Sequence, residues 1–168
     1  MAGATFKLTE RDFGWNHLKE AVLKLGERGA FTLVGVQGRE AAANVQNTAL
    51  TYAQLARIHE FGATIRTKKG AIIKIPARSF LQATIDKYRA DIQKRAVAFG
   101  KGVVLDLFTP EQALELLGEY VVGLIRQRMA DGIPPPNRPS TIKRKGSSKP
   151  LIDTGGLRGS ITHRPEVG

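Results

Sequence analysis

The segment from Thr109 to Gly132 constrains the fold more than any other part of the sequence. Thr109 suits the N-cap of a helix, Pro110 its first position, and Glu111 the first turn, where the helix dipole favours a negative charge. Apolar residues then recur at helical spacing, at Leu114, Leu117, Val121, Leu124 and Ile125. The pattern predicts one long amphipathic helix, around which the rest of the chain must pack.

A second long helix is predicted after Pro76, with Ser79 as its N-cap. Its apolar residues form one narrow stripe at helical spacing, namely Leu81, Ile85, Tyr88, Ile92 and Phe99. Three lysines spaced seven residues apart form a second stripe: Lys87, Lys94 and Lys101. The exposed side of this helix is therefore predicted to be basic.

Shorter elements are predicted on either side of these two helices. A helix from Gly14 to Gly26 and another from Thr51 to about Glu60 have apolar residues at helical spacing, and Gly62 ends the second. Other predictions rest on β-rich runs and turn residues: a strand at 31–36, a loop at 38–49, strands at 64–67 and 71–75 around a lysine-bearing turn, a helical turn at 157–160 and a strand at 161–163.

Residues 133–150 differ in composition from the rest of the chain. Five prolines, three serines and a glycine are interleaved there with five basic residues, and no packed element fits this pattern. A loop of this length is either functional or disordered.

Together the elements predict a single α+β domain over residues 1–168, in which a small antiparallel or mixed sheet packs against two long helices. The long basic loop belongs to that domain.

The charge of the chain points to polyanionic surroundings. Its 26 Lys and Arg against 15 Asp and Glu give a net charge of +11, and residues 61–100 and 133–168 hold nearly all of the excess. The sequence predicts no membrane span and no secretory signal, which favours folding in the cytoplasm. Because the chain has no cysteine, thiolate nucleophiles, zinc-cysteine sites and iron–sulfur clusters are excluded.

Three strings resemble catalytic or cofactor motifs; two fail on closer comparison, and the third is kept as a minor alternative, a protease in which Asp153→Asn would abolish cleavage and leave the fold intact. His59-Glu60 lacks the second histidine of a zinc-protease helix, because position 63 is alanine, so both residues are interpreted as surface or interface groups. Gly35 and Gly38 form only part of a dinucleotide fingerprint. Asp153 lies in a string that resembles the active-site loop of retroviral aspartic proteases, in which two aspartates share a proton, but those enzymes are almost wholly β. We therefore expect no catalytic, metal or cofactor site.

The basic side chains are the candidate contacts to DNA or to a partner. They are Lys68, Lys69, Lys74, Lys87, Lys94, Lys101, Lys143, Arg144 and Lys145, and Arg78 could join them on a phosphate backbone. Aromatic residues make up only 7% of the chain and are not interleaved with these clusters, which argues against a stacking platform for single strands. The pattern predicts attraction to a phosphate backbone without sequence readout.

Three strings in fixed order resemble one known family. They run from Leu55 to Ala63, from Ile75 to Leu81 and from Pro150 to Ile161. The matching residues are His59, Glu60, Phe61, Gly62, Pro76, Ala77, Arg78, Phe80, Leu81, Asp153, Thr154, Gly155, Leu157, Arg158 and Ser160. Over roughly residues 50–163 the chain resembles the tail-completion, or head-to-tail joining, proteins of long-tailed bacteriophages and their Mu-type virion morphogenesis relatives.

The resemblance implies a structural role without catalysis. It implies a homo-oligomeric ring, of six or twelve copies, in the neck of the virion between the head connector or adaptor and the tail terminator, assembled in the host cytoplasm. Packaged double-stranded DNA would pass through the lumen of this ring. The matching residues would then build the core of the subunit or its interface, with Phe80 and Leu81 as anchors of the long helix. The alternative is an accessory protein that binds DNA without sequence specificity through its basic hairpin and helix stripe.

Overall fold

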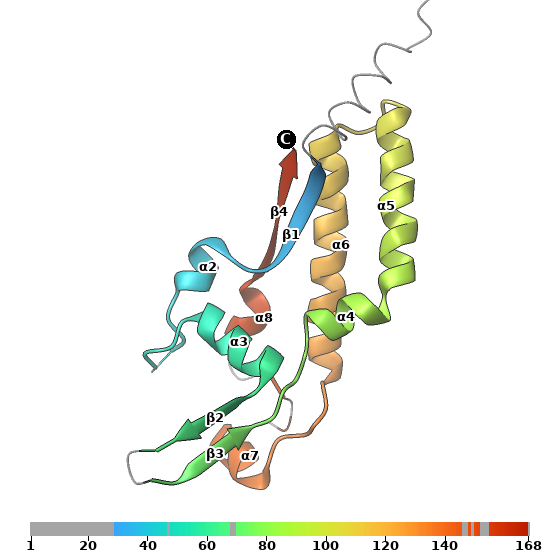
Figure 1. Cartoon of the computed structure of the whole chain (residues 1–168). Coiled ribbons are helices and arrows are strands. Elements are labelled where there is room, and N and C mark those ends of the chain that lie inside the picture. The colour runs from blue at the N-terminus through green and yellow to red at the C-terminus, as the bar shows by residue number, and fades with distance from the viewer. Residues whose placement is uncertain are drawn as a thin grey trace, which may run out of the picture.

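The computed structural model describes residues 29–46, 48–67, 70–145, 148, 150–151 and 155–167. The predicted helix at 14–26 and the candidates Lys68, Lys69, Asp153 and Thr154 lie outside these ranges. Within them the chain has an α+β fold, as predicted, in which strands and helices run side by side as layers (Figure 1). None of the helices described in these ranges is long and apolar enough to cross a membrane.

Helix α6 (Pro110–Asp131) is the central layer of the molecule. It begins where the sequence predicts, because the Thr109 hydroxyl accepts a hydrogen bond from the Gln112 N–H at 3.2 Å while the Gln112 side chain accepts from the Thr109 N–H at 2.9 Å. Strands β1 (Ala30–Val36) and β4 (Ile161–Val167) cover one side of it, and helix α5 (Arg89–Val104) runs antiparallel along another (Figure 1).

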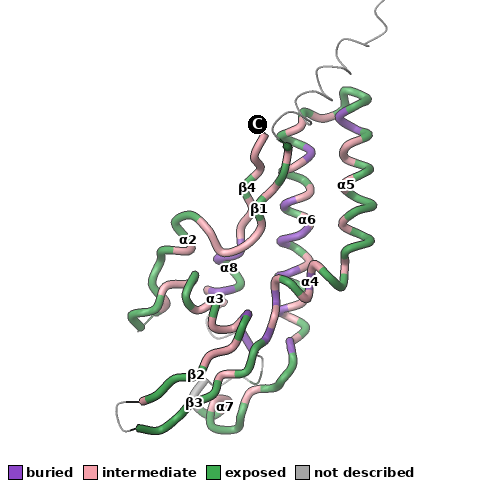
Figure 2. Tube along the Cα trace, viewed as in Figure 1, coloured by how far each residue is buried: buried purple, intermediate pink, exposed green. Residues whose placement is uncertain are grey.

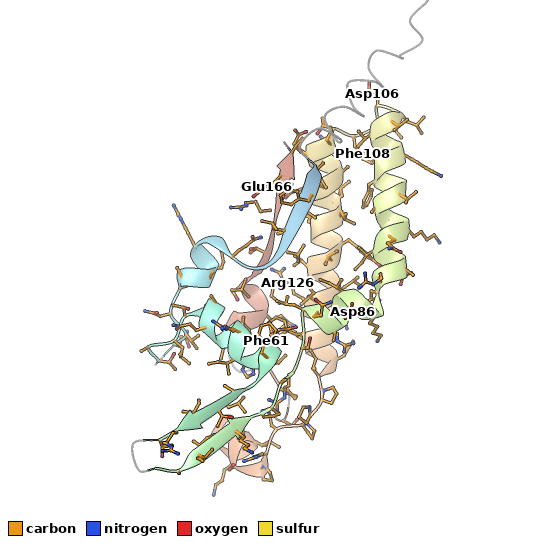
Figure 3. The ribbon with its side chains drawn as sticks, viewed as in Figure 1. Phe61, Asp86, Asp106, Phe108, Arg126 and Glu166 are labelled. Carbon is orange, nitrogen blue, oxygen red and sulfur yellow. The ribbon has the colours of Figure 1, made fainter. Side chains whose placement is uncertain are left out.

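The β1–β4 sheet joins two distant parts of the chain. The strands pair antiparallel from Ala30 opposite Val167 to Val36 opposite Ile161. Val34, Val36 and Ile161 belong to the main hydrophobic core, together with the inward side of α6. Arg126 of α6 also fixes the start of β4, because its guanidinium donates to the Ile161 carbonyl oxygen at 2.7 Å (Figure 3). The predicted strands at 31–36 and 161–163 are thus confirmed, and the second is longer than predicted.

The main core lies where α6 meets the short helices below the sheet. Phe80, Ile125, Met129 and Ile161 are fully buried there. Figure 2 shows this burial along α6 and in α8 (Gly156–Gly159), the helical turn predicted at 157–160, where Leu157 is buried. A smaller cluster joins α5 to the start of α6, where the rings of Phe99 and Phe108 meet edge to face at 6.2 Å between centroids.

The predicted long helix after Pro76 is in fact two helices. Helix α4 (Gln82–Lys87) ends at Tyr88, whose backbone angles (φ −106°, ψ 17°) interrupt the helix before α5 begins. Both pieces contact α6, with α4 crossing it and α5 lying along it (Figure 1), and one straight helix could not do both. Leu81 rather than Ser79 occupies the N-cap position, although the Ser79 hydroxyl accepts from the Ala83 N–H at 3.1 Å.

Two predicted loops contain helices, so both predictions were wrong in part. Residues 38–49 begin with α2 (Gly38–Ala42), which carries no capping side chain, and residues 133–150 include α7 (Pro139–Lys145). Ile133 is also buried. The chain between α6 and α7 is therefore anchored in the core at Ile133, although Pro134, Pro135 and Pro136 are exposed.

The β2–β3 hairpin projects from the rest of the fold. Helix α3 (Tyr52–Phe61) begins at Thr51 with the same reciprocal cap as α6 and ends at Gly62, as predicted. Strands β2 (Ala63–Arg66) and β3 (Ile72–Ile75) then pair antiparallel, and Pro76 follows the second strand. Only Ala63 and Ile75, at the base of the hairpin, are partly buried, so most of the hairpin lies open (Figure 2).

Candidate functional site

Glu60 is buried at the junction between α3 and α4, where the sequence predicted a surface or interface group. One carboxylate oxygen accepts from the Ser79 hydroxyl at 2.6 Å and the Gln82 N–H at 3.0 Å. The other accepts from the N–H groups of Phe80 at 2.9 Å and Leu81 at 3.0 Å. Glu60 therefore supplies the partners that the first backbone N–H groups of a helix otherwise lack, and it supplies them to α4 from another helix.

Arg78 is also buried, so it is not the phosphate contact that the sequence allowed. Its guanidinium donates to the carbonyl oxygens of Pro135 at 2.8 Å and Pro136 at 3.2 Å and to the side-chain oxygen of Asn137 at 3.4 Å. Burial lowers the pKa of the Arg78 guanidinium from its ordinary value. The contacts hold the chain after α6 against the chain before α4.

The backbones of the first two strings touch beside these side chains. The Arg78 N–H donates to the His59 carbonyl oxygen at 2.6 Å. Gly62 has φ +76°, and a Cβ added there would lie 3.0 Å from both the Ala77 nitrogen and the Ile75 carbonyl oxygen. Glycine is thus needed at position 62 for its backbone conformation and for its lack of a side chain.

The third string packs against the start of α3. A Cβ on Gly156 would lie 2.0 Å from the Tyr52 hydroxyl oxygen, so α8 packs directly on α3. Leu157 and Ser160 are buried, and the Ser160 hydroxyl donates to the Leu157 carbonyl oxygen at 2.9 Å. Gly155 has a positive φ of 82°, whereas Arg158 is exposed. Ala56, Phe80, Leu151 and Leu157 belong to one hydrophobic cluster, so the three strings share the main core, although several of their residues, such as Phe61 and Arg158, are exposed.

A groove opens beside this junction. It has a volume of about 1940 Å³ and lies between α3, the β2–β3 hairpin and residues 135–141. Sites for small molecules usually measure about 300–1,000 Å³, so this groove suits a macromolecular segment better. Among the described residues that line it, none is Asp or Glu, whereas Lys74, Arg78 and Arg138 are basic.

The structure separates the candidate basic residues into two groups. Lys74 on β3 and Lys143 on α7 are exposed at the end of the molecule that holds the groove, and Arg144 and Lys145 are the last residues of α7 (Figure 1). We call the hairpin together with α7 the basic end. Lys94 and Lys101 are exposed on α5, away from this end. Lys87 belongs to α4, so the predicted stripe of three lysines on one helix is not formed.

Exposed apolar residues on the hairpin were not predicted as part of the site. Ile65, Ile72 and Ile73 expose 43%, 59% and 47% of their surface, and Phe61 before the hairpin exposes 75%. Neighbouring residues of a strand point to opposite faces, so the pair Ile72-Ile73 places an isoleucine on each face. That pair was the signal in the sequence for a hairpin that is apolar on both faces.

The described residues offer few groups for catalysis or metal binding. Within the described ranges no group of three or more His, Asp or Glu side chains could hold a metal ion. The Nε2 of His163, on β4, lies 3.0 Å from a Glu115 carboxylate oxygen of α6. In a separate exposed cluster, hydrogen bonds from Gln82 and Arg89 lower the pKa of Asp86. These contacts join elements of the fold and do not converge on the groove.

Arg78→Lys tests whether Arg78 holds the fold together. A lysine keeps the charge but cannot reach three acceptors as the planar guanidinium does, so we expect the free energy of unfolding to fall by about 1.5–3 kcal/mol. Urea unfolding measures this loss. Arg89→Lys is the matched control, because Arg89 is exposed and pairs only with Asp86, and it should change stability by at most about 0.5 kcal/mol. An Arg78→Lys variant as stable as the wild type would contradict the assignment.

Comparisons of the chain with protein families, with curated proteins and with solved structures find no match.

Proposed function

We propose that the chain is a non-enzymatic structural protein of a bacteriophage neck, where copies form a ring around the DNA channel between the head connector and the tail terminator. The motif resemblance supplies the family. The geometry supports an assembly subunit, because it offers apolar surfaces that need partners and a basic end that suits DNA. In this role the residues of the basic end attract the phosphate backbone without reading bases.

The projecting hairpin is the observation that carries the proposal. A two-stranded hairpin is marginally stable by itself, and this one exposes isoleucines on both faces. Exposed apolar patches of this kind mark interaction sites in soluble proteins. Both the small size of the hairpin and its exposed isoleucines are explained if another subunit or a neighbouring neck protein covers these side chains.

The junction of the first two strings supports the motif resemblance. Glu60, Arg78 and Gly62 join segments that lie far apart in the chain, and each contact depends on the residue type present. Motif residues that contact one another in the fold make the resemblance more specific than motifs matched only in sequence. It concerns the architecture of a subunit and brings no reacting groups together.

Electron microscopy of particles purified from the source tests the proposed function. We expect density for a ring of this chain between head and tail, with the chain identified in the same particles by mass spectrometry. Particles made without the chain should accumulate as separate heads and tails, and supplying the wild-type chain should restore joining. Absence of the chain from finished particles would overturn the proposal.

The basic end favours a second candidate function, an accessory protein that binds duplex DNA without sequence specificity. Lys74, Arg138 and Lys143 belong to the same end, and the described lining of the groove has no carboxylate to repel a phosphate. This function requires the isolated chain to bind DNA tightly, whereas a neck ring requires only that the assembled copies surround it. The affinity of the isolated chain for duplex DNA therefore distinguishes the two functions.

Reversing two charges at the basic end should weaken DNA binding. For Lys74→Glu/Lys143→Glu we expect a lower affinity for duplex DNA. The slope of log K against log salt concentration should also become less steep, by about 0.9 for each phosphate that the variant no longer neutralises. Fluorescence anisotropy with a labelled duplex between about 50 and 200 mM salt measures both quantities.

The matched control reverses two exposed lysines at the other end of the molecule. Lys94→Glu/Lys101→Glu makes the same change in net charge, so a loss of affinity caused by net charge would be equal in the two variants. Equal losses would contradict the assignment of DNA contact to the basic end. Wild-type affinity that does not change with salt would remove the DNA-binding function altogether.

A further inference from the structure

The outer face of the β1–β4 sheet is open within the described structure. Helix α6 packs on the inner face, whereas Phe31 and Leu33 point outward and are 44% and 41% exposed. Glu166 lies opposite Phe31, and Arg164 lies opposite Leu33. Figure 3 shows Glu166 on this strand pair. A sheet of only two strands needs a cover on its apolar face, as sheets pack against helices or other sheets.

The side of α5 that faces away from α6 is the opposite end of the same stack of layers (Figure 1). Its residues repeat at i, i+4, i+7, i+11 and i+14, the spacing of a helix-packing stripe: Ala90, Lys94, Val97, Lys101 and Val104. Val97 and Val104 are 59% and 44% exposed. We call these five residues the α5 stripe.

The α5 stripe and the sheet face match in length. Fourteen residues of helix rise about 21 Å, and the seven residues of β1 span about 20 Å. The strands and α5 run along the same direction of the molecule (Figure 1). One α5 could therefore cover the sheet face of another copy from end to end, as α6 covers the inner face.

The charges disfavour contact between two α5 stripes and permit contact of one stripe with the sheet face. Residues 82–104 carry five Lys and Arg against two Asp and Glu, and residues 105–131 carry two against five. On the outer sheet face Arg164 and Glu166 form an ion pair with each other, so this face carries no excess of positive charge that would repel the lysines of the α5 stripe. Pairing the α5 stripes of two copies would instead bring lysines together at a cost in electrostatic energy.

We propose that copies of this chain associate head to tail, with the α5 stripe of one copy on the outer sheet face of the next. The inference rests on the proposed ring and identifies the surfaces that build it. Each copy contacts one neighbour through its α5 stripe and the other neighbour through its outer sheet face. Copies joined in this way form a closed ring when the rotation from one copy to the next is a whole fraction of a full circle. The basic end then stays free for DNA or for another neck protein.

Engineered cysteines test this contact directly, because the chain has none of its own. We expect purified Leu33→Cys and Val97→Cys variants to form a disulfide-linked dimer when equal amounts are mixed and oxidised, and little product when each is oxidised separately. The Leu33→Cys/Val97→Cys double variant should give a ladder of larger products. Glu119→Cys, which is exposed on α6 and belongs to neither face, is the control and should not link to Val97→Cys.

Each other outcome overturns the inference in a distinguishable way. Strong linkage of Val97→Cys to itself would show contact between two α5 stripes. Linkage of Leu33→Cys to a Leu18→Cys substitution in the same chain would show that the chain's own N-terminal segment covers the sheet. No mixed product, in solution or in particles that contain a neck ring of this chain, would overturn the contact and leave the proposed function standing.

Discussion

Glu60→Ala should lower the free energy of unfolding by about 3–5 kcal/mol, because it leaves up to four hydrogen-bond donors without their partner. These donors are the Ser79 hydroxyl and the N–H groups of Phe80, Leu81 and Gln82. Water cannot replace the carboxylate at Phe80, which is fully buried. Urea unfolding followed by circular dichroism gives the loss, and hydrogen exchange at the three amides shows where it arises.

Two further variants distinguish the cap from a general effect of charge. Glu60→Gln keeps one acceptor oxygen but turns an NH₂ group toward N–H donors, so its stability should fall between those of the wild type and Glu60→Ala. Glu119→Ala removes an exposed carboxylate from α6 and should change stability by at most about 0.5 kcal/mol. Equal stabilities of Glu60→Ala and Glu119→Ala would show that Glu60 does not hold α4.

Gly118→Ala and Gly123→Ala should change stability in opposite directions, although both exchange the same residues in the same helix. A Cβ on Gly118 would lie 2.4 Å from the His163 ring, so the sheet must shift and we expect a loss of about 1–3 kcal/mol. A Cβ on Gly123 has no atom within 4 Å, and the higher helix propensity of alanine should give a gain of about 0.5–1 kcal/mol.

Thermal unfolding measures both changes, at about 2–4 °C for each kcal/mol in a chain of this size. The pair controls for helix propensity, which is equal at the two positions. If Gly118→Ala is as stable as Gly123→Ala, the sheet does not press closely on α6 at this position. The distance between Glu115 and His163 in the Gly118→Ala variant gives an independent check, because the same shift separates them.

The helices with complete local signals were predictable from the sequence. Thr51 and Thr109 each have a glutamine three residues later, so the cap, the first turn and the apolar spacing agree. Helix α2 has no capping side chain and α7 lies among prolines, so neither carries such a signal. The break at Tyr88 has no proline or glycine to mark it, since it arises from the packing of α4 and α5 on α6.

The candidate site was predictable in its residues and not in their roles. The strings that contain Glu60 and Arg78 were identified as core or interface residues, but a surface role for Glu60 and a phosphate contact for Arg78 were also predicted, and their hydrogen-bond partners were not. Their partners lie 19–22 residues away for Glu60 and 57–59 residues away for Arg78, and no local pattern specifies such contacts. The basic end is similar, because only the fold brings Lys74 beside residues 138–141.

The pairing of β1 with β4 also determines when the chain can finish folding. Ala30 and Val167 are neighbours in the sheet, so residues 37–160, which separate β1 from β4, must be synthesised before the sheet can form. Until then the inward side of α6, with Val122, Ile125 and Met129, lacks its cover and exposes an apolar surface to chaperones or to aggregation. A chain in which β4 has not yet been synthesised thus cannot present the outer sheet face, so copies can join one another only after β1 and β4 have paired.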